Sequence, residues 1–105
     1  MNMLHSNISL TEIEDLIHTV ADMIGVDHDR LRSRRTIERA RCYRHAIWFI
    51  LSNDFDISQR WMSEYFETSR NTIKHGVNAF KNPDPAHATA LKLVRAKLNR
   101  LSTGL

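Results

Sequence analysis

A run of polar side chains between residues 70 and 78 has the chemistry to read the edges of DNA bases. If this stretch is helical, its exposed positions carry hydrogen-bonding groups and no carboxylate: Arg70, Asn71, Thr72, Lys74, His75 and Asn78. Arginine can bond a guanine edge in two places, asparagine an adenine edge, and a threonine methyl can pack on thymine. A solvated helix face usually includes Glu or Asp, which would repel phosphate. The pattern therefore favours a DNA recognition helix over an ordinary surface helix.

A second set of residues could bind DNA phosphates. Residues 1–29 contain six of the 12 acidic residues and no Lys or Arg, so all 15 Lys and Arg fall in residues 30–105. Positive charge concentrated in this way suits a polyanion. A basic segment at 30–35 has no core periodicity and is expected to be an exposed loop. The predicted phosphate ligands are Arg32, Arg34, Arg35, Ser58, Ser69 and Asn78.

Helical periodicity accounts for the elements that must position these residues. Apolar spacing predicts helices at about 11–24, 36–52, 58–66, 70–80 and 85–101, with a short helical turn at 27–31. Start and stop signals support these limits, namely a capping box at Ser9 and Glu12, a stop at Gly25, and Asp84 followed by Pro85. Asn53 and Asp54 are expected to end the long central helix. We therefore expect a single all-α domain, a compact bundle of five to six helices, over residues 9–102, with 1–8 disordered or extended and 103–105 as a tail.

Two of these helices have the spacing of a helix-turn-helix, within about residues 56–81. Met62 and Phe66 are the expected inward residues of the first helix, together with Trp61, and Ile73, Val77 and Phe80 those of the second. Either Asp56 or Ser58 could cap the first helix. Glu67-Thr68-Ser69 forms the turn, and Thr68 or Ser69 could cap the second helix. Glu67 stands where such turns often have glycine, so either the turn differs in shape or a backbone strain of roughly 1 kcal/mol is tolerated.

The whole arrangement resembles the C-terminal DNA-binding domain of DnaA-type replication initiators, whose fold is related to the Trp repressor. The resemblance covers about residues 8–101 and rests on the turn Met23–Leu31, a basic loop at Ser33–Arg35, and a long helix with Arg44-His45-Ala46-Ile47. It also includes Ser58, which lies fourteen residues beyond Arg44 as in the family. The family's Asp-His-Thr-Thr-Val signature is replaced by Ser69-Arg70-Asn71-Thr72-Ile73, so the Asp-His pair is absent.

The resemblance implies a division of labour on duplex DNA. The helix at 70–80 would read the major groove, and the basic segment at 30–44 would grip phosphates and the minor groove. By the family's pattern, Arg44 would reach bases in the minor groove. An alternative is that Arg44 makes an intrahelical pair or extends its side chain over the core. Because the Asp-His pair is missing, recognition of the family's usual DNA site is not expected.

Several functions are disfavoured by what the sequence lacks. It has no phosphate-binding Gly-x-x-x-x-Gly-Lys-Ser/Thr loop, so the ATPase module of the initiators is absent and a free-standing regulator is expected. The six His do not cluster at ligand spacing and Cys42 has no Cys partner, so neither a metal nor another cofactor is expected. No signal peptide or membrane span is predicted. A cytoplasmic, nucleoid-associated protein that is not an enzyme fits these features.

Two interactions with other proteins remain open. The acidic first helix, with Glu12, Glu14, Asp15 and Asp22, could dock a protein partner in a module that keeps the fold without binding DNA. The last helix, 85–101, carries a stripe of Leu91, Val94, Leu98 and Leu101 that could close the monomer core or pair two chains. Core closure is favoured for a domain of this size.

Overall fold

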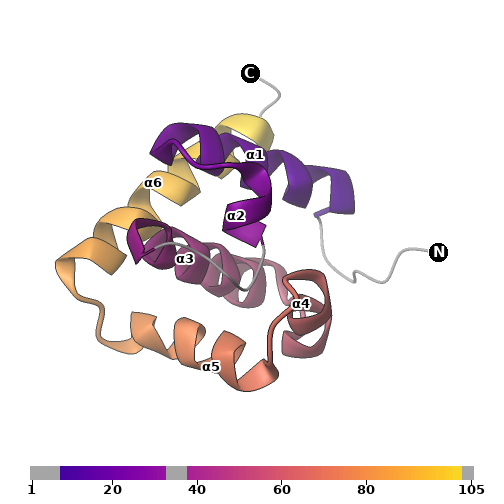
Figure 1. The fold of residues 1–105 in the computed structure, drawn as a ribbon, viewed down its shortest axis with the longest axis vertical. Helices are drawn as coiled ribbons and strands as arrows, with labels where there is room; N and C mark the ends of the chain where they lie inside the picture. The colour runs from indigo at the N-terminus through magenta and orange to yellow at the C-terminus, as the bar shows by residue number, and fades with distance from the viewer. Residues whose placement is uncertain (1–7, 33–37, 103–105) are drawn as a thin grey trace.

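Helix α3 (Glu38–Phe55) runs through the middle of the molecule, with α1 on one side and α5 on the other (Figure 1). The computed structural model describes residues 8–32 and 38–102, without the side chains of Arg39, Leu101 and Ser102. These residues are almost entirely helical and include no strand, which confirms the all-α prediction. The other elements are α1 (Leu10–Ile24), α2 (His28–Arg32), α4 (Gln59–Tyr65), α5 (Arg70–Asn78), the 3₁₀ turn η1 (Ala79–Lys81) and α6 (Pro85–Ser102).

Local capping signals explain where most helices begin and end. The Ser9 hydroxyl accepts a hydrogen bond from Glu12 N, and the Glu12 carboxylate accepts one from Ser9 N, which completes the predicted capping box. Gly25 ends α1 in the left-handed conformation, with φ 74°. The Asp84 carboxylate accepts a hydrogen bond from His87 N, and Pro85 occupies the first position of α6. These short-range signals are why the limits of α1 and the start of α6 lie within one residue of those predicted.

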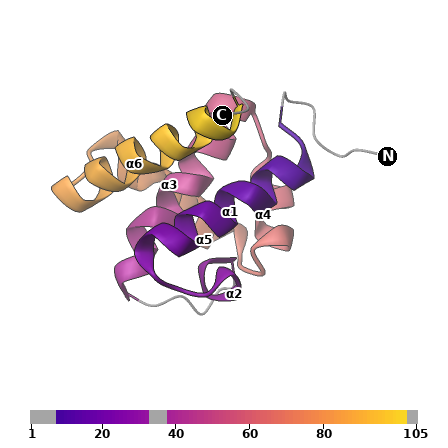
Figure 2. The same ribbon diagram turned by 90° about the horizontal axis from the view of Figure 1, so that it is seen from above.

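Buried side chains from all six α-helices form one core around α3, and Figure 2 shows α1 and α6 lying across α3. Helix α3 contacts α1, α2, α5, η1 and α6, so it buries side chains all round rather than on one stripe. Its buried apolar residues are Ala40, Ala46, Ile47, Trp48, Ile50 and Leu51. In α6, Val94 and Leu98 are buried and Leu91 is half-buried, so this stripe closes the monomer core.

The structure corrects several details of the sequence prediction. Asn53 and Asp54 do not end the central helix, which continues to Phe55. Trp61 is only half-buried, and the last turn of the predicted helix 70–80 is the 3₁₀ turn η1. Ile8, assigned to the N-terminal segment, is buried in the core. Residues 1–7, 33–37 and 103–105 lie outside the described residues, as does the side chain of Leu101. The predictions for the start of the helix at 36–52, for Leu101 and for the two chain ends therefore stay predictions.

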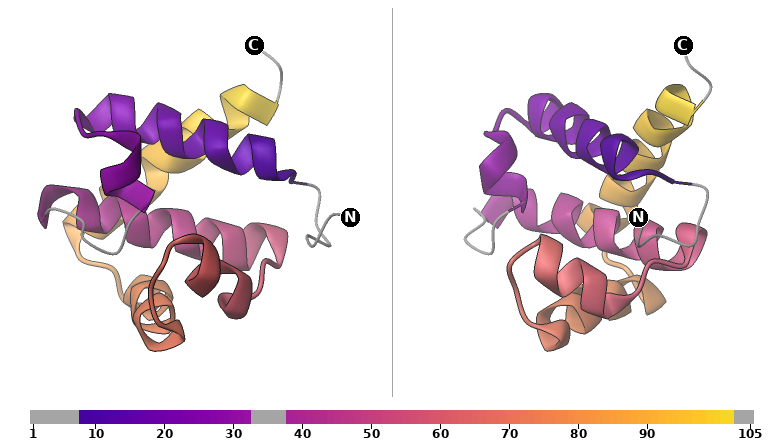
Figure 3. Two further views of the ribbon diagram at one scale, coloured as in Figure 1. Left: turned by 45° about the vertical axis from the view of Figure 1, so that its right-hand side comes forward. Right: turned by 90° about the vertical axis from the view of Figure 1, so that its right-hand side faces the viewer.

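Helices α4 and α5 pack against each other on the far side of α3 from α1 (Figure 3). Ser58 caps α4 by accepting a hydrogen bond from Trp61 N, and Ser69 caps α5 by accepting one from Thr72 N. Ser58 and Ser69, rather than Asp56 and Thr68, are thus the N-caps. We call residues 58–78 the α4–α5 unit. Its inner side is formed by Met62, Phe66 and Ile73, all of which are fully buried.

Candidate nucleic-acid interface

All the predicted base-reading residues that lie on α5 are exposed to solvent. Its inner side consists of the buried Ile73 and Gly76, with Val77 half-buried. The remaining side chains are all exposed, and none is acidic: Arg70, Asn71, Thr72, Lys74, His75 and Asn78. The structure therefore brings five predicted base-reading residues and the predicted phosphate ligand Asn78 together on one outward surface.

These outward side chains make few hydrogen bonds and no ion pairs among the described residues. Within the described residues, Thr72 alone among them has a side-chain hydrogen-bond partner, since its Oγ1 lies 2.9 Å from Ser69 Oγ. By contrast, two arginines on other helices pair with acids: Arg41 Nη2 lies 2.6 Å from Glu38 Oε2, and Arg95 Nη2 lies 2.9 Å from Asp54 Oδ1. The donors and acceptors of α5 are thus available to an external partner.

The turn before α5 includes a residue in the left-handed conformation. Glu67 has φ 56°, so the position where glycine would be favoured does adopt the left-handed backbone. A non-glycine residue there costs roughly 1 kcal/mol or more. The strain must be offset by contacts that hold the turn in place.

Two arginines from other helices provide such contacts at the end of α4. Arg32 Nη1 donates a hydrogen bond of 2.9 Å to the carbonyl of Tyr65, and its guanidinium lies over the Tyr65 ring at 5.3 Å. Arg44 Nη2 donates one of 3.3 Å to the carbonyl of Phe66, and its guanidinium lies 4.9 Å from the centre of the Trp48 ring. The last carbonyls of a helix lack partners within it and carry partial negative charge, so these cations stabilise that end of α4.

Arg44 is buried, unlike the predicted base-reading residues of α5, and its role in reading bases stays a prediction. Arg44 is 3% exposed, and this burial lowers the pKa of its guanidinium to about 10. The resemblance implies that Arg44 reaches the minor groove. In this structure its guanidinium instead binds the carbonyl of Phe66 and lies over Trp48, which is closer to the alternative that its side chain extends over the core. Arg32, a predicted phosphate ligand, is half-buried and bound to the same turn. Arg34 and Arg35 lie outside the described residues.

Gly76 is a residue whose importance the apolar pattern did not reveal. A Cβ atom at this position would lie 2.7 Å from Trp48 Cε3 and 2.8 Å from His45 Cδ2. Those contacts are shorter than side chains tolerate, so glycine allows α5 to lie directly on α3. The only sign of this close packing in the sequence was the glycine itself, which stands alone within the predicted helix at 70–80.

Histidines that are distant in sequence meet behind α5. His45 Nδ1 lies 3.1 Å from His87 Nε2, and His87 Nδ1 lies 3.0 Å from Asp84 Oδ1 and 3.6 Å from Cys42 Sγ. Burial, followed by the charge of His87, lowers the pKa of His45 to about 4. No group of three or more His, Cys, Asp or Glu side chains in the described part of the chain is placed to hold a metal ion.

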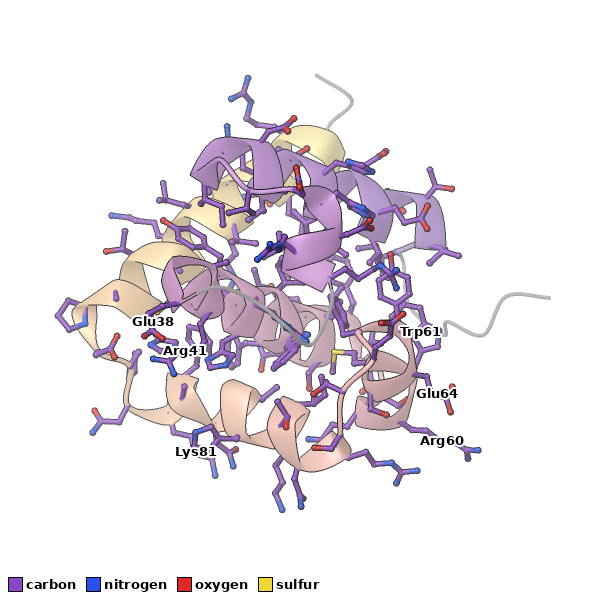
Figure 4. The ribbon with its side chains drawn as sticks, in the orientation of Figure 1. Glu38, Arg41, Arg60, Trp61, Glu64 and Lys81 are labelled. Atoms are coloured by element: carbon purple, nitrogen blue, oxygen red, sulfur yellow. The ribbon has the colours of Figure 1, made fainter. Side chains whose placement is uncertain are left out.

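Basic side chains also lie at both ends of α5 (Figure 4). Arg60 projects from α4 beside Glu64, and Lys81 projects from the end of η1. Neither was among the predicted site residues, because neither lies on the predicted recognition helix or in the basic loop.

Comparison with known proteins identifies no relative. No protein-family model, no curated protein and no solved structure matches this chain. Among the described helices, none is both long and apolar enough to cross a membrane.

Proposed function

We propose that this protein binds double-stranded DNA sequence-specifically, with the α4–α5 unit as a helix-turn-helix and α5 in the major groove. In this role it would regulate transcription or replication and associate with the nucleoid. The observation that carries the proposal is the outward side of α5. Its exposed polar groups lack a carboxylate, and only Thr72 has a side-chain partner within the described residues.

The way α5 is held also supports recognition by rigid docking. Sequence discrimination requires base-contacting side chains on a fixed backbone, because each contact depends on the position of two atoms. Ser69 caps α5, Gly76 lies close against Trp48, and Arg32 and Arg44 bind the turn that precedes the helix. The resemblance to initiator DNA-binding domains favours the same reading surface, and the absent Asp-His pair favours a different target sequence.

Selection of bound duplexes from a random pool, followed by affinity measurements on the selected site, tests this proposal. Arg70→Ala should lower affinity for the selected site by about 1–3 kcal/mol and relax discrimination at one base position. Lys92→Ala on exposed α6 is the matched control and should leave that discrimination unchanged. If the parent protein selects no sequence, or if Arg70→Ala keeps the parent's preference at every position, the proposal is wrong.

A protein-docking role is the second candidate, and the exposed acidic residues of α1 favour it. Glu14, Asp15 and Asp22 are all exposed, whereas Glu12 is engaged in the capping box. A protein that shows no salt-sensitive binding to duplex DNA but forms a stable complex lost in a triple Glu14→Gln, Asp15→Asn, Asp22→Asn variant would support this role. Light scattering of the purified protein would also reveal any dimer formed through α6.

A further inference from the structure

The basic surface of the molecule extends beyond α5 at its C-terminal end. No Asp or Glu occurs between Glu67 and Asp84, and Lys81 lies near the end of this stretch. Phe80 packs against the rings of Phe49 and His87, with ring centres 4.9 Å and 5.4 Å apart. This packing fixes η1 on α3 and α6, while Lys81 is exposed and has no acidic partner among the described residues.

A second cation lies at the other end of α5, on α4. The Arg60 side chain is 74% exposed, and its Nε lies 3.7 Å from Glu64 Oε2. That separation exceeds hydrogen-bonding distance, and an exposed pair of this kind contributes little to stability. An external phosphate can therefore replace Glu64 as the partner of Arg60 at small cost.

These two cations come from the elements that flank α5 in the chain, Arg60 from α4 and Lys81 from η1. The major groove of B-DNA is about 12 Å wide and admits an α-helix, with a phosphate backbone along each side. Figure 4 shows Arg60 and Lys81 projecting into solvent at opposite ends of α5. We infer that Arg60 and Lys81 bind backbone phosphates of the two strands that border this groove. The inference rests on the proposed DNA binding and adds two contact residues from outside the recognition helix.

Phosphate contacts have a signature that base contacts and structural roles lack. Each phosphate neutralised by a cation contributes about 0.9 to the slope of log K against log salt concentration, whatever the base sequence. Loss of one contact therefore lowers affinity about eightfold at 0.1 M salt and flattens the salt dependence. Discrimination between cognate and random duplexes stays unchanged.

The experiment measures salt slopes for the full chain and its single variants on a selected duplex and a random duplex. Arg60→Gln and Lys81→Gln should each reduce the slope by about 0.9 on both duplexes. Lys92→Gln, an equal charge change on exposed α6, should reduce it much less. Equal slopes for the parent, Arg60→Gln and Lys81→Gln would overturn the inference, and a reduced slope in only one variant would overturn it for the other residue.

A variant with the opposite expected effect gives an independent test. Glu64→Gln removes the carboxylate beside Arg60 and should raise affinity for both duplexes severalfold. Arg60 then binds phosphate without first losing its ion pair with Glu64, and the repulsion between the Glu64 carboxylate and phosphate is removed. Asp15→Asn on α1 is the matched control. If the two variants bind equally well, Arg60 and Glu64 do not face the duplex and the inference fails. Failure of the parent to bind any duplex would instead refute the proposed function itself.

Discussion

Arg32 and Arg44 show how arginines can hold the end of a neighbouring helix instead of extending into solvent. Both donate to carbonyls at the end of α4, and both lie over an aromatic ring. In the sequence they are indistinguishable from arginines that bind phosphate or bases. Their carbonyl acceptors lie 33 and 22 residues further along the chain, a separation that no local pattern reveals.

Arg32→Gln should distinguish a positioning role from a phosphate contact. The loss of one charge-assisted hydrogen bond at a half-buried site is expected to lower stability by about 1 kcal/mol, as measured by urea denaturation. Specific affinity should fall because the turn loosens, while the salt slope of DNA binding stays that of the parent. A slope lower by about 0.9 would show that Arg32 binds phosphate. Arg30→Gln, an exposed neighbour on α2, is the control for the charge change.

At the scale of the element, α5 depends on a glycine. Gly76→Ala should destabilise the fold by about 1–3 kcal/mol, because the added methyl would overlap the rings of Trp48 and His45. Denaturant unfolding monitored by circular dichroism measures this change. Asn78→Ala at an exposed position of the same helix should be neutral or slightly stabilising, since alanine favours helix. Equal stability of Gly76→Ala and Asn78→Ala would contradict the tight packing of α5 on α3.

The turn that precedes α5 should respond in the opposite direction. Glu67→Gly relieves the left-handed strain at φ 56° and is expected to stabilise the protein by up to about 1 kcal/mol, after the entropy of glycine is subtracted. The lost ion pair is weak, because Glu67 Oε2 lies 3.8 Å from Arg32 Nη1 and its side chain is 61% exposed. A clear loss of stability in urea would mean that Glu67 makes a larger contribution than its geometry indicates.

Sequence patterns predicted the elements well where the signal was local. Ser9 with Glu12, and Asp84 with Pro85, specify helix starts through groups three or fewer residues apart, and both predictions agree with the structure. The predicted helix end at Asn53 and Asp54 was wrong because Asp54 pairs with Arg95 of α6. This tertiary contact supports the last turn of α3. The short η1 was missed because Phe80 was read as another inward residue of α5. Its actual contacts, with Phe49 and His87, come from two different helices.

At the scale of the whole molecule, charge is separated across α3. The exposed acids of α1 lie on one side and the acid-free face of α5 on the other (Figure 1). Such a distribution orients a protein toward a polyanion before contact is made. The outward face of α5 was predictable because it depends on residue types along one helix. The meeting of His45 and His87 was not, because it depends on how α3 and α6 pack.

His45 should make folding stability depend on pH between about 6.5 and 4. Its pKa in the folded protein is about 4, against 6.5 for an ordinary histidine, so the unfolded chain binds the proton more readily in this range. Stability is therefore full above the unfolded pKa and falls as pH decreases toward the folded pKa. The largest loss is about 2–3 kcal/mol after allowance for partial exposure. Burial is the main cause, and His87, Arg41, His75 and Arg44 add positive charge nearby.

Denaturant midpoints measured at pH 6.5, 5.5 and 5 test this dependence above the range in which most carboxylates titrate. His45→Gln should flatten the pH profile relative to the parent, because glutamine binds no proton. Asn71→Gln, at an exposed position on α5, changes no titratable group, so it is the control and should follow the parent. Parallel profiles for the parent and His45→Gln would show that His45 titrates normally in the folded protein.

The different surroundings of the two tryptophans give this protein a built-in optical reporter. Trp48 is 1% exposed and packs edge-on against Phe66, whereas Trp61 is half-buried and stacks on Tyr65 with an interplanar angle of 11°. A water-soluble quencher should therefore reach the indole of Trp61 and spare that of Trp48 in the native protein. Emission from Trp48 would then report global unfolding, and emission from Trp61 would report events at the α4–α5 unit. Both can be followed in the unlabelled chain during a titration with duplex DNA.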